Sequence, residues 1–327
     1  LTDHQYADGS WNFDHTRGPC EGRCSNPGTC REAPRAATAM ALLPLLGAGH
    51  THVKGDYQGE VNRGLNFLVR SMKVRAGTGS LEEPGGRMYA HGQATIALCE
   101  AYALTGDEQL REPAQLAVNY IVRAQHGEGG WRYQPGERGD TSVVGWQLMA
   151  LKSGQMAYLY VPSKTFDLAG LFLDQVQRDK LGGRYAYQPR GNPTDVMTAE
   201  ALLCRQYLGW RKDNEGLRDG VKFLLEKHPP DADKPNIYYW YYGTQVMHHY
   251  GGPEWWKWNA KMRNVLVDTQ ETKGHAAGSW KPDGRGHSGG FADRGGRIYM
   301  TTLALCILEV YYRHMPIYSQ SVLDGFE

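Results

Sequence analysis

The chain lacks a surplus of charge of either sign. Its 327 residues contain 36 Lys and Arg against 35 Asp and Glu, which gives a formal net charge of +1. Proteins that bind nucleic acid or an anionic membrane surface by charge carry a basic excess, so this balance argues against both partners. The chain also lacks an apolar run of the roughly 20 residues that a transmembrane helix needs. We therefore expect a soluble domain, either cytoplasmic or periplasmic.

The first residue is Leu1 rather than Met, so we expect an upstream segment that would hold any targeting signal. The chain is rich in glycine, with 41 residues, and in large aromatic residues, with 20 Tyr and 9 Trp. The glycines recur before and after apolar stretches instead of gathering in a linker. This distribution indicates helix ends and tight turns that repeat many times.

One unit of a repeat stands in AQHGEGGWRYQPGERGDTSVVGWQLMALKSG, residues 124–154. A first helix ends near Gln125, and a glycine-rich turn that contains Trp131 follows it. Asp140 and the two residues after it then supply the N-cap of a second, apolar helix. Similar units start at three other glutamines, which are Gln5, Gln177 and Gln270.

Six apolar second helices recur at intervals of roughly 50 residues, which indicates a repeat architecture of helical hairpins. An open solenoid needs polar terminal repeats, whereas the last repeat here is as apolar as the others. Small residues near the starts of the second helices would let these helices crowd around one axis: Ala36, Ala37, Gly92, Ala94, Gly145, Ala199 and Gly243. We therefore predict an all-α fold, a closed (α/α)6 toroid with the second helices inside. It would form a single domain over residues 1–318, with a partial first repeat in 1–50 and a C-terminal tail at 319–327.

The spacing of Gln and Trp carries a family resemblance. Clear copies are Gln5/Trp11, Gln125/Trp131 and Gln270/Trp280, and weaker ones are Gln177/Tyr185 and Ser71/Leu81. They resemble the QW repeats of terpenoid cyclases and protein prenyltransferases, in a protein of bacterial type. The resemblance implies an α/α toroid and, if the chain is an enzyme, cyclase, lyase or transferase chemistry on an isoprenoid. In such repeats the Gln bonds the backbone of the next helix and the Trp packs over the end of the outer helix.

Two sites of that family are incomplete in this chain. Cyclases open an inner helix with an Asp-rich signature whose acid protonates the substrate. Asp140 matches the last Asp of that signature, but Gly139 stands where the acid belongs. Prenyltransferases bind zinc through a His that follows a Tyr in the last repeat, whereas Met300 follows Tyr299 here. We therefore expect neither the cyclase acid nor the prenyltransferase zinc, and Asp140 is first of all a helix N-cap.

The segment 289–308 still resembles the last repeat of the prenyltransferases. It contains Asp293, Arg294 and Arg297 before the helix that begins near Tyr299. Arginines at the mouth of a toroid could bind a diphosphate, because the guanidinium group pairs well with phosphate oxygens. A plain surface role is the alternative for these arginines.

Aromatic residues near the starts of the second helices predict an aromatic end of the central cavity. Successive helical residues differ by about 100° in direction, so some of these rings must face the axis. We predict that the substrate contacts Tyr89, His91, Trp146, Tyr239, Trp240, Tyr242, Asp293, Arg294, Arg297 and Tyr299. Asp140 and Asp195 are the candidate catalytic acids. The alternative is that the rings simply fill the core.

The segment HTRGPCEGRCSNPGTC opens a cysteine loop, residues 15–31, before the first inner helix. Cys20, Cys24 and Cys30, with His15 nearby, offer four soft ligands for zinc. Their spacing matches no standard zinc motif, so one disulfide with a free thiol, or three unpaired thiols, are alternatives. Apart from this zinc, we expect no cofactor.

Three functional hypotheses follow. The first is an enzyme that binds an isoprenoid or another hydrophobic small molecule in the aromatic cavity. The second is a non-catalytic toroid that binds a ligand or another protein. The third is a carbohydrate-active toroid, which would need two carboxylates facing each other across the cavity. The predicted inner helices contain Glu100, Glu200 and Glu309 for such a pair. An open cavity of several hundred Å³ with a buried Asp would favour an enzyme.

Overall fold

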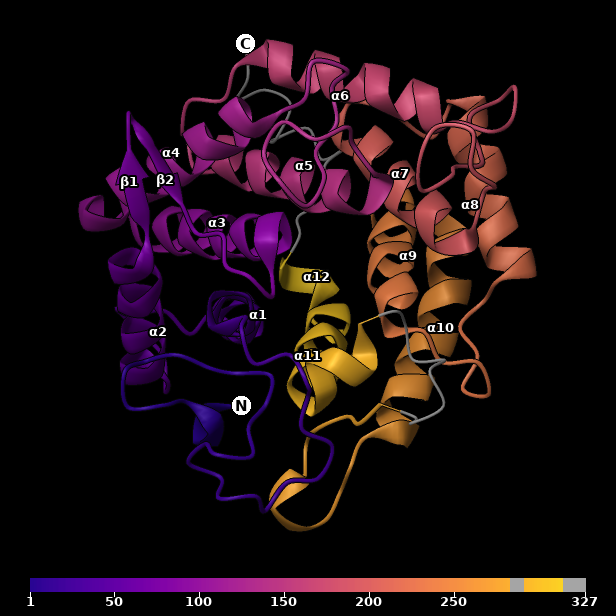
Figure 1. Ribbon diagram of the computed structural model, residues 1–327. Helices are drawn as coiled ribbons and strands as arrows, with labels where there is room; N and C mark the ends of the chain where they lie inside the picture. The colour runs from indigo at the N-terminus through magenta and orange to yellow at the C-terminus, as the bar shows by residue number, and fades with distance from the viewer. Residues whose placement is uncertain (283–290, 314–327) are drawn as a thin grey trace.

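The computed structural model describes residues 1–282 and 291–313, and the predicted tail at 319–327 lies outside them. Six helices form an inner ring, in which each helix contacts the next and the last contacts the first (Figure 1). They are α1 (Pro34–Gly47), α3 (Arg87–Thr105), α5 (Thr141–Met156), α7 (Asp195–Tyr207), α9 (Ile237–Tyr250) and α11 (Ala292–Leu308). The contact between α11 and α1 closes the ring. The predicted (α/α)6 toroid is therefore confirmed, with the second helices inside.

An outer layer of helices covers this ring. It consists of α2 (Gln58–Ser71), α4 (Glu108–Ala124), α6 (Ser163–Val176), α8 (Glu215–Lys227) and α10 (Gly252–Thr269), while the short α12 (Val310–Arg313) follows α11. Each of the five longer outer helices packs against the inner helix that precedes it. Helix α2 shows the reason, because it buries only Val61, Gly64, Leu65 and Leu68, one stripe at helical spacing. The inner helices are buried nearly all round, as in α5, where every residue from 141 to 151 is buried.

Four short elements, two strands and two 3-10 helices, stand outside the helical layers. Strands β1 (Lys73–Arg75) and β2 (Thr78–Ser80) form an antiparallel hairpin that packs against α4, and the sequence pattern did not predict it. Two 3-10 helices, η1 (Thr2–His4) and η2 (Gly274–Ala276), lie in the loops that precede α1 and α11. Among the helices of residues 1–282 and 291–313, none combines the length and apolarity needed to cross a bilayer.

Glutamine side chains tie neighbouring repeats together. The Gln125 amide donates to the carbonyl oxygens of Gly129, at 2.9 Å, and Thr165, at 3.0 Å. Gln5 reaches the carbonyl of Glu60 in the same way, at 2.8 Å. Thr165 and Glu60 lie in the first turns of α6 and α2, so each bond joins a turn to the next outer helix.

Glycines allow the inner helices to pack closely. A Cβ atom on Gly92 would lie 2.7 Å from the Gln147 amide nitrogen, and one on Gly145 would lie 2.2 Å from a Glu200 carboxyl oxygen. Real Cβ contacts this short essentially never occur. Two of the predicted small residues therefore leave space on one inner helix for a side chain of the next inner helix.

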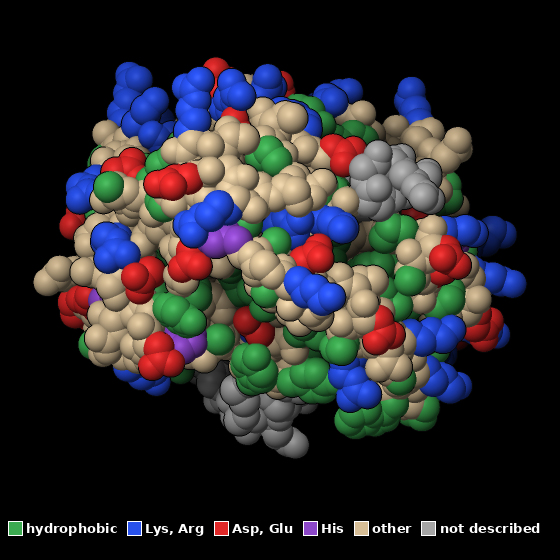
Figure 2. Space-filling model, turned by 90° about the horizontal axis from the view of Figure 1, so that it is seen from below, with side chains coloured by type: hydrophobic (Ala, Val, Ile, Leu, Met, Phe, Trp, Pro, Cys, Tyr) green, Lys and Arg blue, Asp and Glu red, His purple; other side chains and the backbone are tan. Residues whose placement is uncertain are grey.

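The surface is mixed in charge. On the face that Figure 2 shows, acidic and basic side chains are interspersed, with Lys and Arg most frequent along the upper edge of the view. The described part of this face therefore offers no continuous basic patch of the kind that binds nucleic acid.

Candidate functional site

A cavity of about 790 Å³ lies where the six inner helices begin. Each inner helix contributes side chains from its first turns, and the loops that precede them complete the lining. Small-molecule sites usually occupy about 300–1,000 Å³, so the ring has room for a ligand. The alternative that aromatic rings fill the core does not hold at this end.

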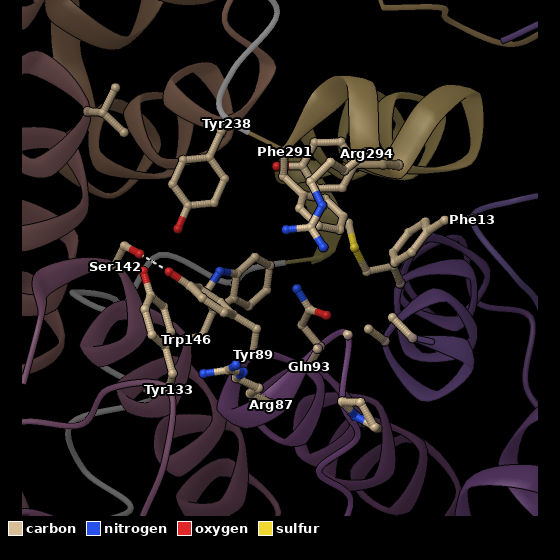
Figure 3. A pocket seen from close by; sticks show the side chains of 18 of the residues that line it. Phe13, Arg87, Tyr89, Gln93, Tyr133, Ser142, Trp146, Tyr238, Phe291 and Arg294 are labelled. Carbon is tan, nitrogen blue, oxygen red and sulfur yellow. Dashed lines mark hydrogen bonds between the residues drawn. The ribbon is translucent and has the colours of Figure 1, made fainter. Parts of the chain in front are cut away.

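The cavity lining is aromatic and polar at once (Figure 3). The rings of Trp146, Tyr238 and Tyr133 face the space together with the side chains of Gln93 and Arg87. Because the N-termini of helices carry partial positive charge, the helix starts favour electron-rich oxygen atoms of a ligand. The described lining residues are Phe13, Ala33, Ala36, Met40, Pro84, Gly85, Gly86, Arg87, Tyr89, Gln93, Tyr133, Ser142, Trp146, Tyr187, Thr194, Val196, Met197, Tyr238, Phe291, Arg294 and Tyr299.

Four of the ten predicted substrate contacts line this cavity: Tyr89, Trp146, Arg294 and Tyr299. The other six lie outside the described lining: His91, Tyr239, Trp240, Tyr242, Asp293 and Arg297. The sequence placed all ten near the starts of inner helices but could not give the direction in which each side chain points.

His91 lies on the side of α3 that faces α4. Its Nδ1 accepts a hydrogen bond from the Leu81 backbone N–H at 3.1 Å, and its Nε2 lies 3.0 Å from the Ala117 carbonyl oxygen. Burial lowers the pKa of His91 to about 4. A neutral imidazole held by two backbone groups is a structural residue, so His91 is not a cavity residue.

Tyr239 and Asp293 are also outside the described lining of the cavity. The Tyr239 hydroxyl donates to the His228 carbonyl oxygen at 2.8 Å, and its ring packs edge-on against Trp258 of α10. Asp293 is exposed to solvent. The two residues lie about 100° or more around their helices from the cavity side, which the sequence alone did not fix.

Arg297 joins two loops instead of lining the mouth. Its guanidinium group donates to the Ser25 carbonyl oxygen at 3.0 Å, to the Ser25 hydroxyl at 2.7 Å and to the Ser279 hydroxyl at 2.8 Å. The side chain is 4 % exposed. Arg297 therefore fastens the cysteine loop to the last repeat.

Asp140 caps α5 as predicted, and it is fully buried. Its Oδ1 accepts from the Val143 backbone N–H at 2.9 Å, while its Oδ2 lies 3.6 Å from Nε of Arg132. Burial raises the pKa of Asp140 to about 6, although hydrogen bonds from Val143 and Tyr187 oppose this shift. Asp140 is therefore a buried acid with a raised pKa, next to the lining residue Tyr187 and two positions before the lining residue Ser142.

Glu200 is a second buried carboxyl group behind the lining. The hydroxyl of the lining residue Tyr238 donates to both Glu200 oxygens, at 3.1 and 3.3 Å. Burial raises the pKa of Glu200 well above its usual value, and the charge of Asp140 raises it further. Two buried acids in different environments therefore stand beside one cavity.

Two further carboxyl groups, Glu100 of α3 and Glu309 at the C-terminal end of α11, lie at the opposite end of the ring from the cavity. Glu100 accepts two hydrogen bonds from Arg313, both at 2.9 Å. Burial raises the pKa of Glu309 to about 8, and Arg313 opposes this shift. This end of the ring is held by an ion pair and is separate from the cavity.

Asp195, the other predicted acid, does not line the cavity. Its Oδ2 lies 3.3 Å from His228 Nδ1, and its Oδ1 accepts from the Val196 backbone N–H at 2.8 Å. Its neighbours Thr194 and Val196 do line the cavity. The acid of α7 that contacts a lining residue is Glu200, which lies behind Tyr238 and for which the sequence offered only a position on an inner helix.

Three tyrosines of the lining, Tyr133, Tyr187 and Tyr238, were not among the predicted substrate contacts. Tyr133 and Tyr187 come from the glycine-rich turns before α5 and α7, and their hydroxyl oxygens lie 2.7 Å apart. Both occupy the second position after the aromatic residue of the repeat, Trp131 or Tyr185. That shared position was the available signal, because equivalent turns lie side by side in a ring.

The cysteine loop divides into two environments. The Cys24 sulfur lies 3.0 Å from His275 Nδ1, and the ligand atoms of Cys20 and His4 lie close by. Cys30 lies elsewhere, with its sulfur 3.9 Å from the Gly85 carbonyl oxygen. The four predicted zinc ligands are therefore not together, since only Cys20 and Cys24 share one place.

His15 also lies outside that group. It is buried, and its ring packs edge-on against the His4 ring at a centroid distance of 5.2 Å.

Comparisons with known proteins agree with this architecture. No family model matches the chain, and no curated protein does. Among solved structures, the α-1,6-mannanase GH76A of Salegentibacter sp. HEL1_6 is 10% identical, covers 94% of both chains and has a TM-score of 0.61. Cellobiose 2-epimerase from Bacillus thermoamylovorans B4167 is 12% identical, covers 88% of both chains and has a TM-score of 0.59.

A protein geranylgeranyltransferase-I from Candida albicans is also similar. It is 13% identical, covers 89% of this chain and 90% of that one, and has a TM-score of 0.53. Identities this low show the fold alone. The protein is an (α/α)6 toroid with an aromatic cavity at the N-terminal ends of its inner helices.

Proposed function

We propose that the chain is an enzyme that acts on a carbohydrate in the cavity, with Asp140 and Glu200 as its acid–base pair. The observation that carries the proposal is the presence of two buried carboxyl groups, both with raised pKa, beside one aromatic, polar cavity. Glycoside chemistry depends on such a pair, in which one group gives a proton and the other takes one.

The cavity lining suits a sugar better than a hydrocarbon chain. Aromatic faces such as that of Trp146 stack on the C–H faces of sugar rings, and hydroxyl groups need donors and acceptors around them. Gln93, Ser142 and the tyrosine hydroxyls supply both kinds of hydrogen bond. A purely hydrophobic ligand would leave these polar groups without partners, which costs binding free energy.

One of the two carboxyl groups would act as the base and the other as the acid. Around neutral pH, Asp140 with its pKa of about 6 is mainly ionised and can act as a base. Burial raises the pKa of Glu200 well above its usual value, which favours the protonated form that can act as an acid. Because Tyr238 stands between Glu200 and the cavity, its hydroxyl contacts the substrate and exchanges the proton with Glu200.

Solved structures of similar fold include carbohydrate enzymes. A variant of the Salegentibacter mannanase in which two aspartates are replaced is inactive and holds an α-1,6-mannotetraose. The epimerase of similar fold is named for the disaccharide cellobiose. Carbohydrate chemistry therefore occurs in toroids of this size.

The test is a panel of oligosaccharides of mannose, glucose and galactose in α and β linkages, with products followed by reducing-end assay and NMR. We expect turnover of one linkage class by the wild type. Glu200→Gln and Asp140→Asn should each lose about 10²–10⁴-fold in rate, the usual contribution of one acid or base. Asn remains a good N-cap, so the second variant changes the acid while keeping the helix start.

Glu309→Gln is the matched control, because it removes another buried carboxyl group of the inner ring, far from the cavity. Its rate should stay within about two-fold of the wild type. The proposal would be abandoned if no saccharide reacted or bound. It would also be abandoned if the Asp140 and Glu200 variants kept full activity.

A hydrophobic ligand is the second candidate. Phe13, Met40 and Phe291 form an apolar side of the cavity, with the rings of the two phenylalanines 5.5 Å apart. Arg294 beside Phe291 could bind an anionic head group, and the similar geranylgeranyltransferase is complexed with GGPP. Native mass spectrometry of the purified protein, followed by lipid extraction, tests this candidate. A stoichiometric prenyl lipid in place of a bound sugar would favour it.

A further inference from the structure

We propose that His4, Cys20, Cys24 and His275 form a structural zinc site that joins the first repeat of the toroid to the last. The atoms that these four residues offer as ligands all lie within 4.8 Å of one another. Zinc bonds of about 2.3 Å to sulfur and about 2.1 Å to nitrogen put the ligands of a tetrahedron roughly 3.3–3.8 Å apart. The four side chains therefore need only small shifts to surround one ion.

The ligand chemistry is that of a structural zinc site. Two cysteines and two histidines make up the Cys2His2 set, which fills all four positions and leaves none for a substrate. The Cys24 backbone N–H points at the Cys20 sulfur at 3.4 Å. A backbone donor of this kind stabilises a thiolate, which is the form that binds the metal.

The proposed site is largely buried, but a metal ion can reach it from solvent. Cys20 is fully buried and Cys24 is 5 % exposed, while His4 and His275 are partly exposed. A second cavity of about 250 Å³ touches His4, Cys24 and His275, and it gives an ion a path to the site.

The site lies where the beginning of the chain meets the last repeat. His4 belongs to η1 and the cysteines to the cysteine loop, whereas His275 belongs to η2, between α10 and α11. These segments meet at the lower edge of Figure 1. A single ion would therefore fix the N-terminal segment to the loop before α11, next to the Arg297 bonds to Ser25.

The sequence could not reveal this ligand set. His275 is separated from Cys24 by 251 positions, and no spacing rule links them. The four ligands predicted from the cysteine loop shared only Cys20 and Cys24 with the set that the fold assembles.

The experiment measures metal on the purified full-length chain, prepared without chelators and kept reduced with a phosphine. Elemental analysis should find about one zinc per chain, before or after incubation with ZnCl₂ and gel filtration. Cys24→Ser and His275→Asn should each lower this to below about a tenth. Cys30→Ser and His15→Asn are the matched controls from the same loop, and they should keep the full equivalent.

A Co²⁺ titration of the wild type tests the site directly, so the proposal stays testable if a ligand variant fails to fold. Co²⁺ titrated into the reduced wild type should give the thiolate charge-transfer band and the intense visible bands of a tetrahedral centre, with an end point near one equivalent. A weak octahedral spectrum, or no stoichiometric zinc in the reduced wild type, would overturn the proposal. So would loss of zinc from Cys30→Ser or His15→Asn together with its retention in Cys24→Ser.

Discussion

Replacement of Arg313 by Met should weaken the closed ring at the end away from the cavity. The Arg313 side chain is 2 % exposed and contacts both carboxyl oxygens of Glu100, which is 20 % exposed, at 2.9 Å. Its guanidinium group also donates to the Leu43 carbonyl oxygen, so one side chain links α12, α3 and α1. Met keeps most of the apolar volume and removes the charge and the donors.

The expected loss follows from the burial of the pair. Removal of one partner of a buried ion pair costs about 3–5 kcal/mol, and the partial exposure of Glu100 favours the lower end, about 3 kcal/mol. An unfolding entropy of about 2.1 cal/mol/K per residue gives roughly 0.7 kcal/mol/K for a chain of this length. The Tm should therefore fall by about 4 °C.

Calorimetry and urea unfolding at pH 7 measure this change. Arg138→Met is the control, because its pair with Glu128 is 77% and 42% exposed and should contribute less than about 1 kcal/mol. The double variant Arg313→Met/Glu100→Gln should recover part of the loss, since the Glu100 carboxylate then no longer lacks its ion-pair partner. If Arg313→Met unfolded at the same urea concentration as the control, the argument for this ion pair would fail.

Two further predictions concern the cavity end. Because burial raises the folded pKa of Asp140 from 3.8 to about 6, its ionisation opposes folding. The free energy of unfolding should therefore fall as pH rises from 4 to 6, by at most about 3 kcal/mol, and Asp140→Asn should flatten this slope in urea titrations at several pH values. Gly145→Ala would place a Cβ atom 2.2 Å from a Glu200 oxygen and should cost about 1–3 kcal/mol. Gly127→Ala, which meets no atom within 4 Å, should change the midpoint little, and equal shifts for both alanines would contradict the packing argument.

The sequence predicted the fold because the helices and turns of the toroid follow from local sequence patterns. Asp140 caps α5, and glutamines such as Gln125 mark the turn of each repeat. The inner helices are apolar on every side, whereas outer helices such as α2 are apolar along one stripe. Caps, turns and periodicity depend on residues a few positions apart, so a single chain displays them directly.

The lining of the cavity was predicted only in part. Tyr89 and Trp146 line the cavity as expected, but His91, two positions after Tyr89, points to the outer layer. Two positions along a helix are about 200° of rotation, which separates a cavity residue from a buried structural one. The sequence also gave no reason to place Glu200 beside Asp140.

By itself, then, the sequence determined the helices, their inner and outer roles, and the number of hairpins. Tertiary structure alone decided which rings face the cavity, which carboxyl groups are buried beside it, and which Cys and His side chains meet. The physical reason is that helix formation responds to neighbours within about four positions. The direction of a side chain and its partners depend on how helices hundreds of residues apart pack around the common axis.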